Sequence, residues 1–138
     1  MSPADPARPR PSPTTATLPF WEAARRHELV VQRCSACGQH RHYPQPMCPA
    51  CHSLEYAWAR CSGRGSIYSY TVCHRAFHPF WKDRVPYVIA TIELEEGVRM
   101  LCDLPDLPPE QAAIGLPVEV CFDDLDPDLT LPRFRVAR

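Results

Sequence analysis

The chain has 138 residues, of which 45% are hydrophobic and 22% are charged, and its formal net charge is -1. These values suit one soluble globular domain, or a small module joined to a barrel-sized one. No run approaches the ~18 apolar residues of a membrane span, and the N-terminus lacks the apolar core of a signal peptide. We therefore expect a cytoplasmic protein that neither enters a membrane nor serves mainly to bind phosphate backbones.

Proline dominates the first residues of the chain. Six of the 17 prolines lie between residues 3 and 19. Proline removes backbone donors and clashes with the preceding helical turn, and this segment has almost nothing apolar to bury. Residues 1–17 are therefore predicted to form a disordered Pro-rich tail, with a proline-rich ligand for another module as the alternative.

A short helix is predicted over residues 18–27, LPFWEAARRH. Thr17 is a candidate N-cap, and Pro19 is tolerated in the first turn. A helix this short is unstable alone. Phe20 and Trp21 must therefore dock, either on this chain's own core or on a partner.

Two C-x-x-C pairs follow a predicted strand at 28–34. The pairs are separated by ten residues and consist of Cys34, Cys37, Cys48 and Cys51. Each pair can supply two ligands of a tetrahedral Zn²⁺ site from one tight turn, and four cysteines leave no position open for catalysis. We expect one structural Zn²⁺ per chain, with a redox dithiol or an iron centre as the alternative. Gly38 suits the first turn, and His52 is expected to adopt the left-handed conformation in the second without binding the metal.

The rest of the chain has the pattern of a β-protein. Alternating runs rich in β-branched and aromatic residues are separated by turn residues, and one helical turn is expected at 108–113. The predicted strands are 56–60, 66–75, 87–96, 98–104, 117–124 and 130–136. The predicted fold class is mainly β, with a helix and zinc ribbon at 18–57 and a small barrel of the OB type at 58–138.

The loop RAFHPFWKDRVP, residues 75–86, combines aromatic rings with cationic side chains. Such loops bind partners, acyl-CoA or single-stranded nucleic acid, although Phe77 and Trp81 could instead plug the barrel end. Together with the helix, the loop supplies the candidate partner- or ligand-binding residues Phe20, Trp21, Arg75, Phe77, His78, Phe80 and Trp81. Residues 85–138 carry 4 Lys and Arg against 11 Asp and Glu, which argues against nucleic acid.

No constellation for independent catalysis is present. The sequence contains no Gly-rich phosphate loop and no G-x-S-x-G or H-E-x-x-H motif. The four remaining cysteines stand alone in apolar or strand-like runs, where small buried thiols are common. We therefore predict no catalytic residue and no enzyme activity for the chain by itself.

The order of these features resembles one family, the zinc-ribbon plus OB-fold proteins long classed as a domain of unknown function. That family accompanies thiolases, thiolase-like aldolases and other acyl-CoA enzymes. The matching stretches are PFWEAARRHELVVQRCSACG (19–38), PMCPAC (46–51), SGRGSIYSYTVCHR (62–75), PYVIATIELEEGVRML (86–101), IGLPVEVCFDD (114–124) and TLPRFR (130–135).

The resemblance implies a rubredoxin-like ribbon and a non-catalytic accessory subunit of a hetero-oligomer. Its thiolase-like partner would perform thiolysis, condensation, retro-aldol cleavage or acyl transfer in lipid or steroid metabolism. The small subunit would stabilise that partner and help to form its acyl-CoA site. The four paired cysteines carry over as metal ligands, and no catalytic residue carries over. A single-stranded nucleic-acid-binding module is the alternative function.

Overall fold

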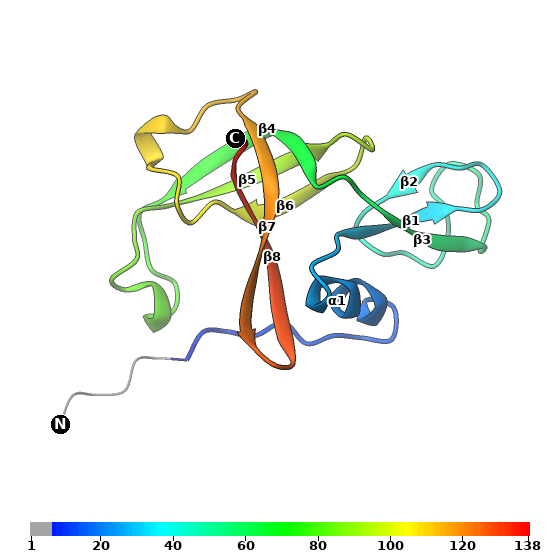
Figure 1. Ribbon diagram of the computed structural model, residues 1–138, viewed down its shortest axis with the longest axis horizontal. Helices are drawn as coiled ribbons and strands as arrows, with labels where there is room; N and C mark the ends of the chain where they lie inside the picture. Colours follow the sequence, from blue (N-terminus) through cyan, green and yellow to red (C-terminus); the bar gives the residue numbers. More distant parts are fainter. Residues whose placement is uncertain (1–6) are drawn as a thin grey trace.

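Residues 7–138 are described by a computed structural model, in which a small β-ribbon lies beside a larger β-barrel (Figure 1). The elements, in chain order, are α1 (Leu18–Arg25), β1 (Val30–Cys34), β2 (His40–Arg41), β3 (Tyr56–Arg60), β4 (Arg64–Cys73), the 3-10 helix η1 (Pro79–Trp81), β5 (Tyr87–Leu94), β6 (Arg99–Asp103), the 3-10 helix η2 (Pro109–Gln111), β7 (Pro117–Asp126) and β8 (Leu129–Val136). The mainly β fold class, with one short helix, a ribbon and an OB-type barrel, is confirmed.

The ribbon is an antiparallel sheet with strand order β2-β1-β3. In its register Gln32 pairs with Arg41 on one side and with Trp58 on the other. Helix α1 precedes this sheet and ends at Arg25, two residues before the predicted end, because His27 adopts a φ of 59°. Thr17 is the N-cap residue, as predicted, but its side chain makes no capping hydrogen bond and instead accepts one from the Thr14 amide at 2.9 Å.

The barrel consists of five antiparallel strands in the order β6-β5-β4-β7-β8. Strand β4 bends at an irregularity between Ile67 and Ser69, which is where a small barrel must curve. Buried and half-buried residues alternate along β5, so its apolar side chains enter the barrel as the sequence pattern predicts. Strand β6 contacts β8 and brings the two ends of the sheet together.

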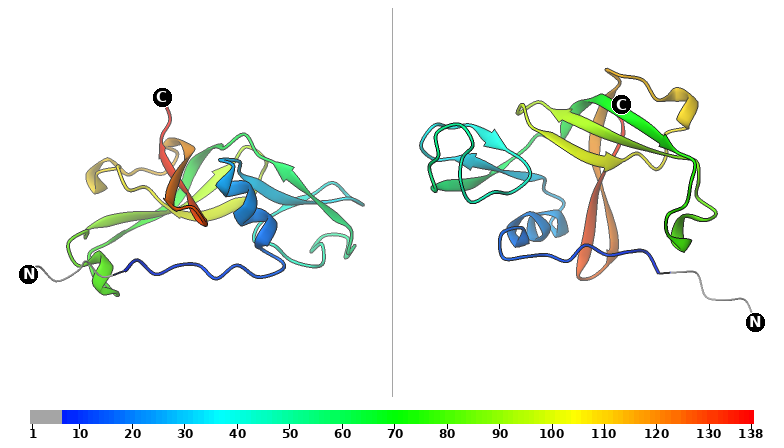
Figure 2. Two further views of the ribbon diagram at one scale, coloured as in Figure 1. Left: turned by 60° about the horizontal axis from the view of Figure 1, so that its bottom comes forward. Right: turned by 180° about the vertical axis from the view of Figure 1, so that it is seen from behind.

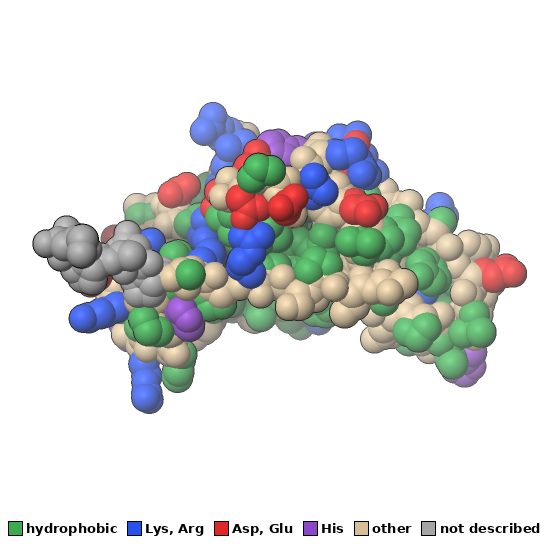
Figure 3. Space-filling model, turned by 90° about the horizontal axis from the view of Figure 1, so that it is seen from below, with side chains coloured by type: hydrophobic (Ala, Val, Ile, Leu, Met, Phe, Trp, Pro, Cys, Tyr) green, Lys and Arg blue, Asp and Glu red, His purple; other side chains and the backbone are tan. Residues whose placement is uncertain are grey.

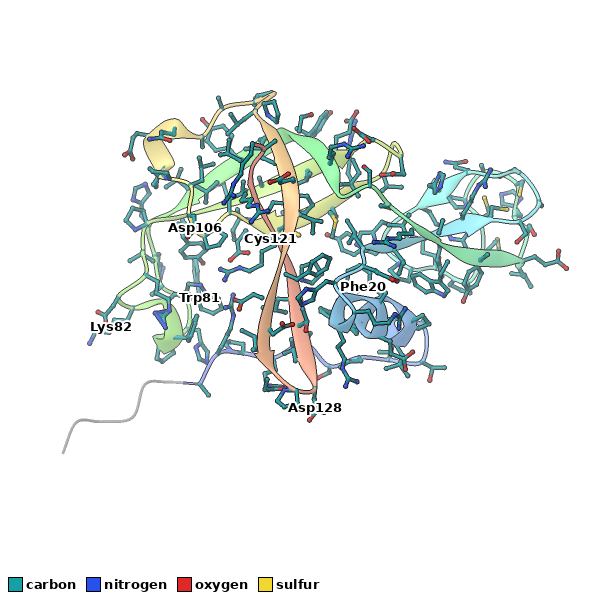
Figure 4. All side chains as sticks on the ribbon, in the orientation of Figure 1. Phe20, Trp81, Lys82, Asp106, Cys121 and Asp128 are labelled. Atoms are coloured by element: carbon teal, nitrogen blue, oxygen red, sulfur yellow. The ribbon has the colours of Figure 1, made fainter. Side chains whose placement is uncertain are left out.

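One hydrophobic core joins the two modules. Phe20, Leu29 and Val31 from the N-terminal part pack in the same cluster as barrel residues such as Ile92 and Phe134. The Phe20 side chain extends from α1 towards the β7–β8 hairpin (Figure 4). Of the two docking alternatives for this ring, the structure therefore selects the chain's own core.

The stretch from residue 7 to residue 17 runs along one side of the molecule, past the β7–β8 hairpin and towards α1 (Figure 2). Arg8 lies 3.8 Å from the Asp103 carboxylate, and Arg10 pairs with Asp126. The predicted disorder of the tail stays a prediction, and residues 1–6 lie outside the described residues. None of the helices described is long and apolar enough to cross a membrane.

Replacing Gly65 with alanine should destabilise the barrel by about 1–3 kcal/mol. A Cβ at this position would overlap the backbone carbonyl of Glu93 on β5, which a β-ladder holds in place. Urea unfolding followed by circular dichroism measures the effect. Ser69→Ala on the exposed side of the same strand is the control and should change stability by less than about 0.5 kcal/mol. Equal midpoints for the two variants would contradict the close approach.

Candidate functional site

The four paired cysteines converge at the tip of the ribbon. Their sulfur atoms all lie within 4.8 Å of one another. The Cys34 and Cys51 sulfurs are 3.5 Å apart, and those of Cys37 and Cys48 are 3.7 Å apart. A tetrahedral Zn²⁺ site with Zn–S bonds of about 2.3 Å needs sulfur–sulfur separations of about 3.8 Å. The donor set and its spacing therefore fit a tetrahedral thiolate site.

The two C-x-x-C turns have the same backbone geometry. The Gly38 amide donates to the Cys34 carbonyl at 2.9 Å, and the His52 amide donates to the Cys48 carbonyl at 2.9 Å. Gly38 has φ 80° and His52 has φ 66°, so both adopt the left-handed conformation that closes such a turn. The His52 side chain is outside the cluster of four sulfurs.

Backbone amides at the turns favour thiolates. The Cys37 amide donates to the Cys34 sulfur at 3.5 Å, and this contact lowers the pKa of Cys34 to about 6. Backbone hydrogen bonds also lower the pKa of Cys48. Cys34 and Cys48 are almost completely buried, whereas Cys37 and Cys51 are exposed. The ribbon therefore covers the side of the cluster formed by Cys34 and Cys48, and the side formed by Cys37 and Cys51 is open to solvent.

The four unpaired cysteines are buried or half-buried, and burial affects their thiols. Burial raises the pKa of Cys61 to about 12 and that of Cys102 to about 12. Both groups are therefore protonated thiols at neutral pH and poor nucleophiles. Only Cys61 of the four is fully buried, and Cys73, Cys102 and Cys121 are half-buried.

The aromatic loop lies at the end of the barrel away from the ribbon (Figure 1). Phe80 and Trp81 pack edge to face with ring centres 4.9 Å apart, and Trp81 stacks on Tyr87 at 6.1 Å. The His78 Nδ1 atom accepts a hydrogen bond from the Phe80 amide at 3.1 Å and so begins η1. Phe77 is 81% exposed and does not plug the barrel end. The Arg75 guanidinium covers one face of its ring at 5.1 Å.

A cleft of about 340 Å³ lies between this loop and β6. Its walls combine the rings of Phe80 and Trp81 with the guanidinium groups of Arg8, Arg84 and Arg133. Arg84 lies 4.1 Å above the centre of the Phe80 ring. We call this space the aromatic–arginine cleft.

A second hollow, of about 320 Å³, opens where α1, the ribbon and the barrel meet. Its lining is mostly apolar and includes Phe20, Trp21, His42, Tyr43, Leu101 and Pro132. We call it the junction groove. The Tyr43 hydroxyl accepts a hydrogen bond from the Leu101 amide at 3.0 Å and thereby ties the ribbon to strand β6.

The seven candidate binding residues thus divide between two places. Phe20 and Trp21 line the junction groove, and Phe80 and Trp81 line the aromatic–arginine cleft. The other three candidates, Arg75, Phe77 and His78, belong to the same loop but line neither hollow. In Figure 4, Phe20 and Trp81 lie on opposite sides of the β7–β8 hairpin. The Asp103–Arg133 ion pair, 2.6 Å long, lines both hollows and forms the wall between them.

Sequence analysis missed His42, Tyr43 and Arg133. His42 and Tyr43 lie in the irregular segment between the cysteine pairs, and Arg133 is one of several charged residues in a predicted strand. Their role depends on contacts between modules that are far apart in sequence. The aromatic dipeptide His42-Tyr43 was a weak local signal, and no local pattern indicated Arg133.

A polar hollow of about 600 Å³ separates α1 from the tip of the β7–β8 hairpin. His27 Nε2 lies 3.0 Å from the Asp124 carboxylate, and hydrogen bonds from Thr130 and His27 lower the pKa of that carboxyl. Both side chains are more than half exposed, so this is a surface contact that contributes little to stability. Seen from below in Figure 3, charged side chains gather above a band of hydrophobic ones.

Comparison with known proteins identifies both modules. Residues 21–57 match the family described as "ChsH2, rubredoxin-like zinc ribbon domain", and residues 58–123 match "ChsH2, C-terminal OB-fold domain". A chain of the solved Ltp2-ChsH2(DUF35) aldolase is 41% identical and superposes with a TM-score of 0.84. The match covers 94% of this chain and 100% of that chain.

Two relatives extend the comparison. A DUF35 domain-containing scaffold protein of Methanocaldococcus jannaschii is 39% identical over 104 residues, which are 75% of this chain and 73% of the relative. A probable enoyl-CoA hydratase alpha subunit of Thermomonospora curvata is 42% identical over 130 residues, or 94% of this chain. The chain spans only 40% of the length of that second relative.

His42 should make the protein less stable in mild acid. Burial lowers the pKa of His42 to about 4, against about 6.5 in an unfolded chain, so the unfolded state binds a proton first as the pH falls. Between about pH 7.5 and pH 5.5 this effect should remove about 1 kcal/mol of stability.

Urea unfolding of His42→Phe and of the wild type at both pH values measures this contribution. The His42→Phe variant should lose about 1 kcal/mol less over that interval. His74→Gln, at an exposed position, is the control and should keep the wild-type dependence. An unchanged pH dependence in His42→Phe would contradict the assignment.

Proposed function

Since this chain belongs to the DUF35 family, whose members join a ChsH2-type zinc ribbon to an OB-fold domain, we propose that it is a non-catalytic accessory subunit of a thiolase-like acyl-CoA enzyme. The observation that carries the proposal is the similarity, over the full length of the matched chain, to a subunit of the Ltp2-ChsH2(DUF35) aldolase. The scaffold name of the archaeal relative supports the same role. The partner would perform the thiolysis, condensation, retro-aldol or acyl-transfer chemistry.

The proposed cofactor is one structural Zn²⁺ per chain, held by Cys34, Cys37, Cys48 and Cys51. The spacing of the four sulfurs and the backbone amides that favour thiolates support this assignment. A closed set of four thiolates offers no position for substrate, so the metal would contribute folding energy and no chemistry. Between the cysteine pairs the ribbon contains only the two-residue strand β2. Because so short a strand supplies few backbone hydrogen bonds, the metal would be needed to hold this segment in place.

The aromatic–arginine cleft is the part of the chain that we propose contributes to the acyl-CoA site. Guanidinium groups suit phosphate groups, and an aromatic wall suits a stacked adenine. Arg133 is engaged by Asp103 and Asp123, so Arg84 is the arginine of the cleft best placed to accept an anion. The residues of this cleft would complete a site whose reactive groups lie on the partner.

Single-stranded nucleic acid is the competing ligand for the same cleft. The acidic β7–β8 hairpin argues against it. Asp123 lies 2.9 Å from Arg133, which lines the cleft, and Asp124 and Asp126 follow on the same strand, so these carboxylates would repel a phosphate backbone. Absence of binding to a short oligonucleotide at low salt is therefore expected. Binding that weakens steeply with salt would favour the nucleic-acid function.

Metal removal tests the structural site. Cys48→Ser should lose the bound metal and destabilise the ribbon by several kcal/mol, because a buried ligand position then holds a group that binds zinc poorly. Metal content by mass spectrometry and thermal unfolding of the full chain measure both effects. The control Cys121→Ser should retain about one zinc per chain. A red, iron-containing protein would instead support a rubredoxin-type centre.

Partner assembly tests the accessory role. We expect the tagged chain to copurify from its native lysate, at low salt, with a thiolase-sized protein in stoichiometric amount. Phe77→Ala should weaken that complex by about tenfold or more, because a large exposed aromatic ring is the type of residue that anchors interfaces.

The control for that experiment is Ile114→Ala, which removes an equally exposed apolar side chain from the loop beside η2. It should leave the complex unchanged, and both variants should keep their zinc. If the two variants behave alike, the aromatic loop is not the interface. If the wild-type chain is recovered alone with its metal, stable assembly under these conditions is refuted.

A further inference from the structure

One buried cation in the ribbon lacks an acidic partner. The Arg41 side chain is 6% exposed, and it forms no ion pair within residues 7–138. Its Nε atom donates to the Gln32 side-chain oxygen at 2.8 Å, and Nη2 donates to the Gln45 carbonyl at 2.8 Å. Nη1 is buried and has no hydrogen-bond partner in the described structure. A buried guanidinium with only neutral acceptors is costly, and its retention needs an explanation.

The local sequence supplies almost no negative charge to compensate it. Between residues 29 and 59, Glu55 is the single acidic residue, and Arg33 and Arg41 are the only Lys or Arg residues. Glu55 is exposed, so it does not neutralise a buried group. The other source of negative charge in this stretch is the group of four cysteines, once they are deprotonated by a metal.

The geometry places Arg41 on the cysteine face of the ribbon sheet. Arg41 pairs with Gln32 across β1 and β2, and Cys34 lies two residues beyond Gln32 on the same face of β1. The Arg41 guanidinium lies 5.0 Å from the centre of the Tyr56 ring, and Tyr56 is the β3 residue paired with Cys34. The Gln45 carbonyl accepts a hydrogen bond from Nη2, and Gln45 is three residues before Cys48 of the second cysteine pair.

We propose that Arg41 is the counter-charge of the metal-bound cysteine cluster. Four thiolates around one divalent cation leave two net negative charges in a partly buried site. Solvent screens the attraction between this dianion and the guanidinium less than it screens a surface ion pair, because Arg41, Cys34 and Cys48 are buried. Arg41 therefore stabilises the loaded site, and the loaded site compensates the burial of Arg41. The inference rests on the proposed metal site and extends it to a residue outside the ligand set.

Three substitutions in the full chain separate charge from packing. Arg41→Met removes the charge and keeps an apolar stem, whereas Arg41→Lys keeps the charge and loses the fork that reaches both Gln32 and Gln45. Arg60→Met removes a charge of the same sign from the same sheet, at a side chain that is 70% exposed and beside Glu28. Zinc affinity is measured by competition with a chromogenic chelator, independently of any enzyme activity.

Arg41→Met should bind zinc about 10–100-fold more weakly, as is typical when an outer partner of a metal site is removed. Arg41→Lys should stay within about threefold of the wild type, and Arg60→Met should not differ from it. If Arg41→Met does not fold, Arg41→Gln removes the charge while keeping a polar side chain, and it should show the same weakening relative to Arg41→Lys. A loss larger than about tenfold in Arg41→Lys would show that hydrogen bonding, not charge, is what matters there.

Two other outcomes would overturn the inference. Equal weakening in Arg60→Met and Arg41→Met would assign the effect to overall charge, and unchanged affinity in Arg41→Met would remove any role for the residue. Both outcomes leave the metal site itself intact. A wild-type chain that binds no zinc would refute the metal site, and with it the premise.

Discussion

The arrangement of the whole molecule depends on one shared hydrophobic core. A ribbon of short strands cannot bury enough apolar surface to be stable by itself. Phe20 and Val31 therefore pack into the cluster that also contains Phe134 of the barrel. This shared burial holds α1 against the β7–β8 hairpin and fixes where the ribbon stands. The junction groove is a consequence, because it occupies the space that the shared core leaves at the surface.

A single ion pair then separates two chemically different surfaces. Asp103 and Arg133 join β6 to β8, with an apolar groove on one side and an aromatic–arginine cleft on the other. The groove offers apolar contacts to a docking side chain, whereas the cleft offers guanidinium groups beside aromatic rings. An accessory subunit of the proposed kind would use both kinds of surface. The cysteine cluster lies apart from both, at the far end of the ribbon.

The sequence was most informative where function depends on local spacing. Two C-x-x-C pairs with a glycine after the first predict a metal turn, and the structure brings the four sulfurs together. The alternation of β5 likewise predicts which side chains are buried. At Thr17 local reasoning found the N-cap residue but not its hydrogen bond, because the side chain contacts Thr14 instead of the helix. The sequence also named Phe20 and Trp81 together as candidate binding residues, although the hairpin separates them.

The sequence by itself determined the mainly β fold class and the group of four cysteines, because periodicity and short motifs are properties of neighbouring residues. It indicated the family only through the resemblance of the order of these features, which the comparisons then confirmed. Only the tertiary structure decided which rings are buried, where the junction groove and the aromatic–arginine cleft lie, and that Arg41 is buried with no acidic partner among residues 7–138. Those features depend on contacts between segments far apart in the chain. Burial and charge pairing are properties of such contacts, and no local pattern encodes them.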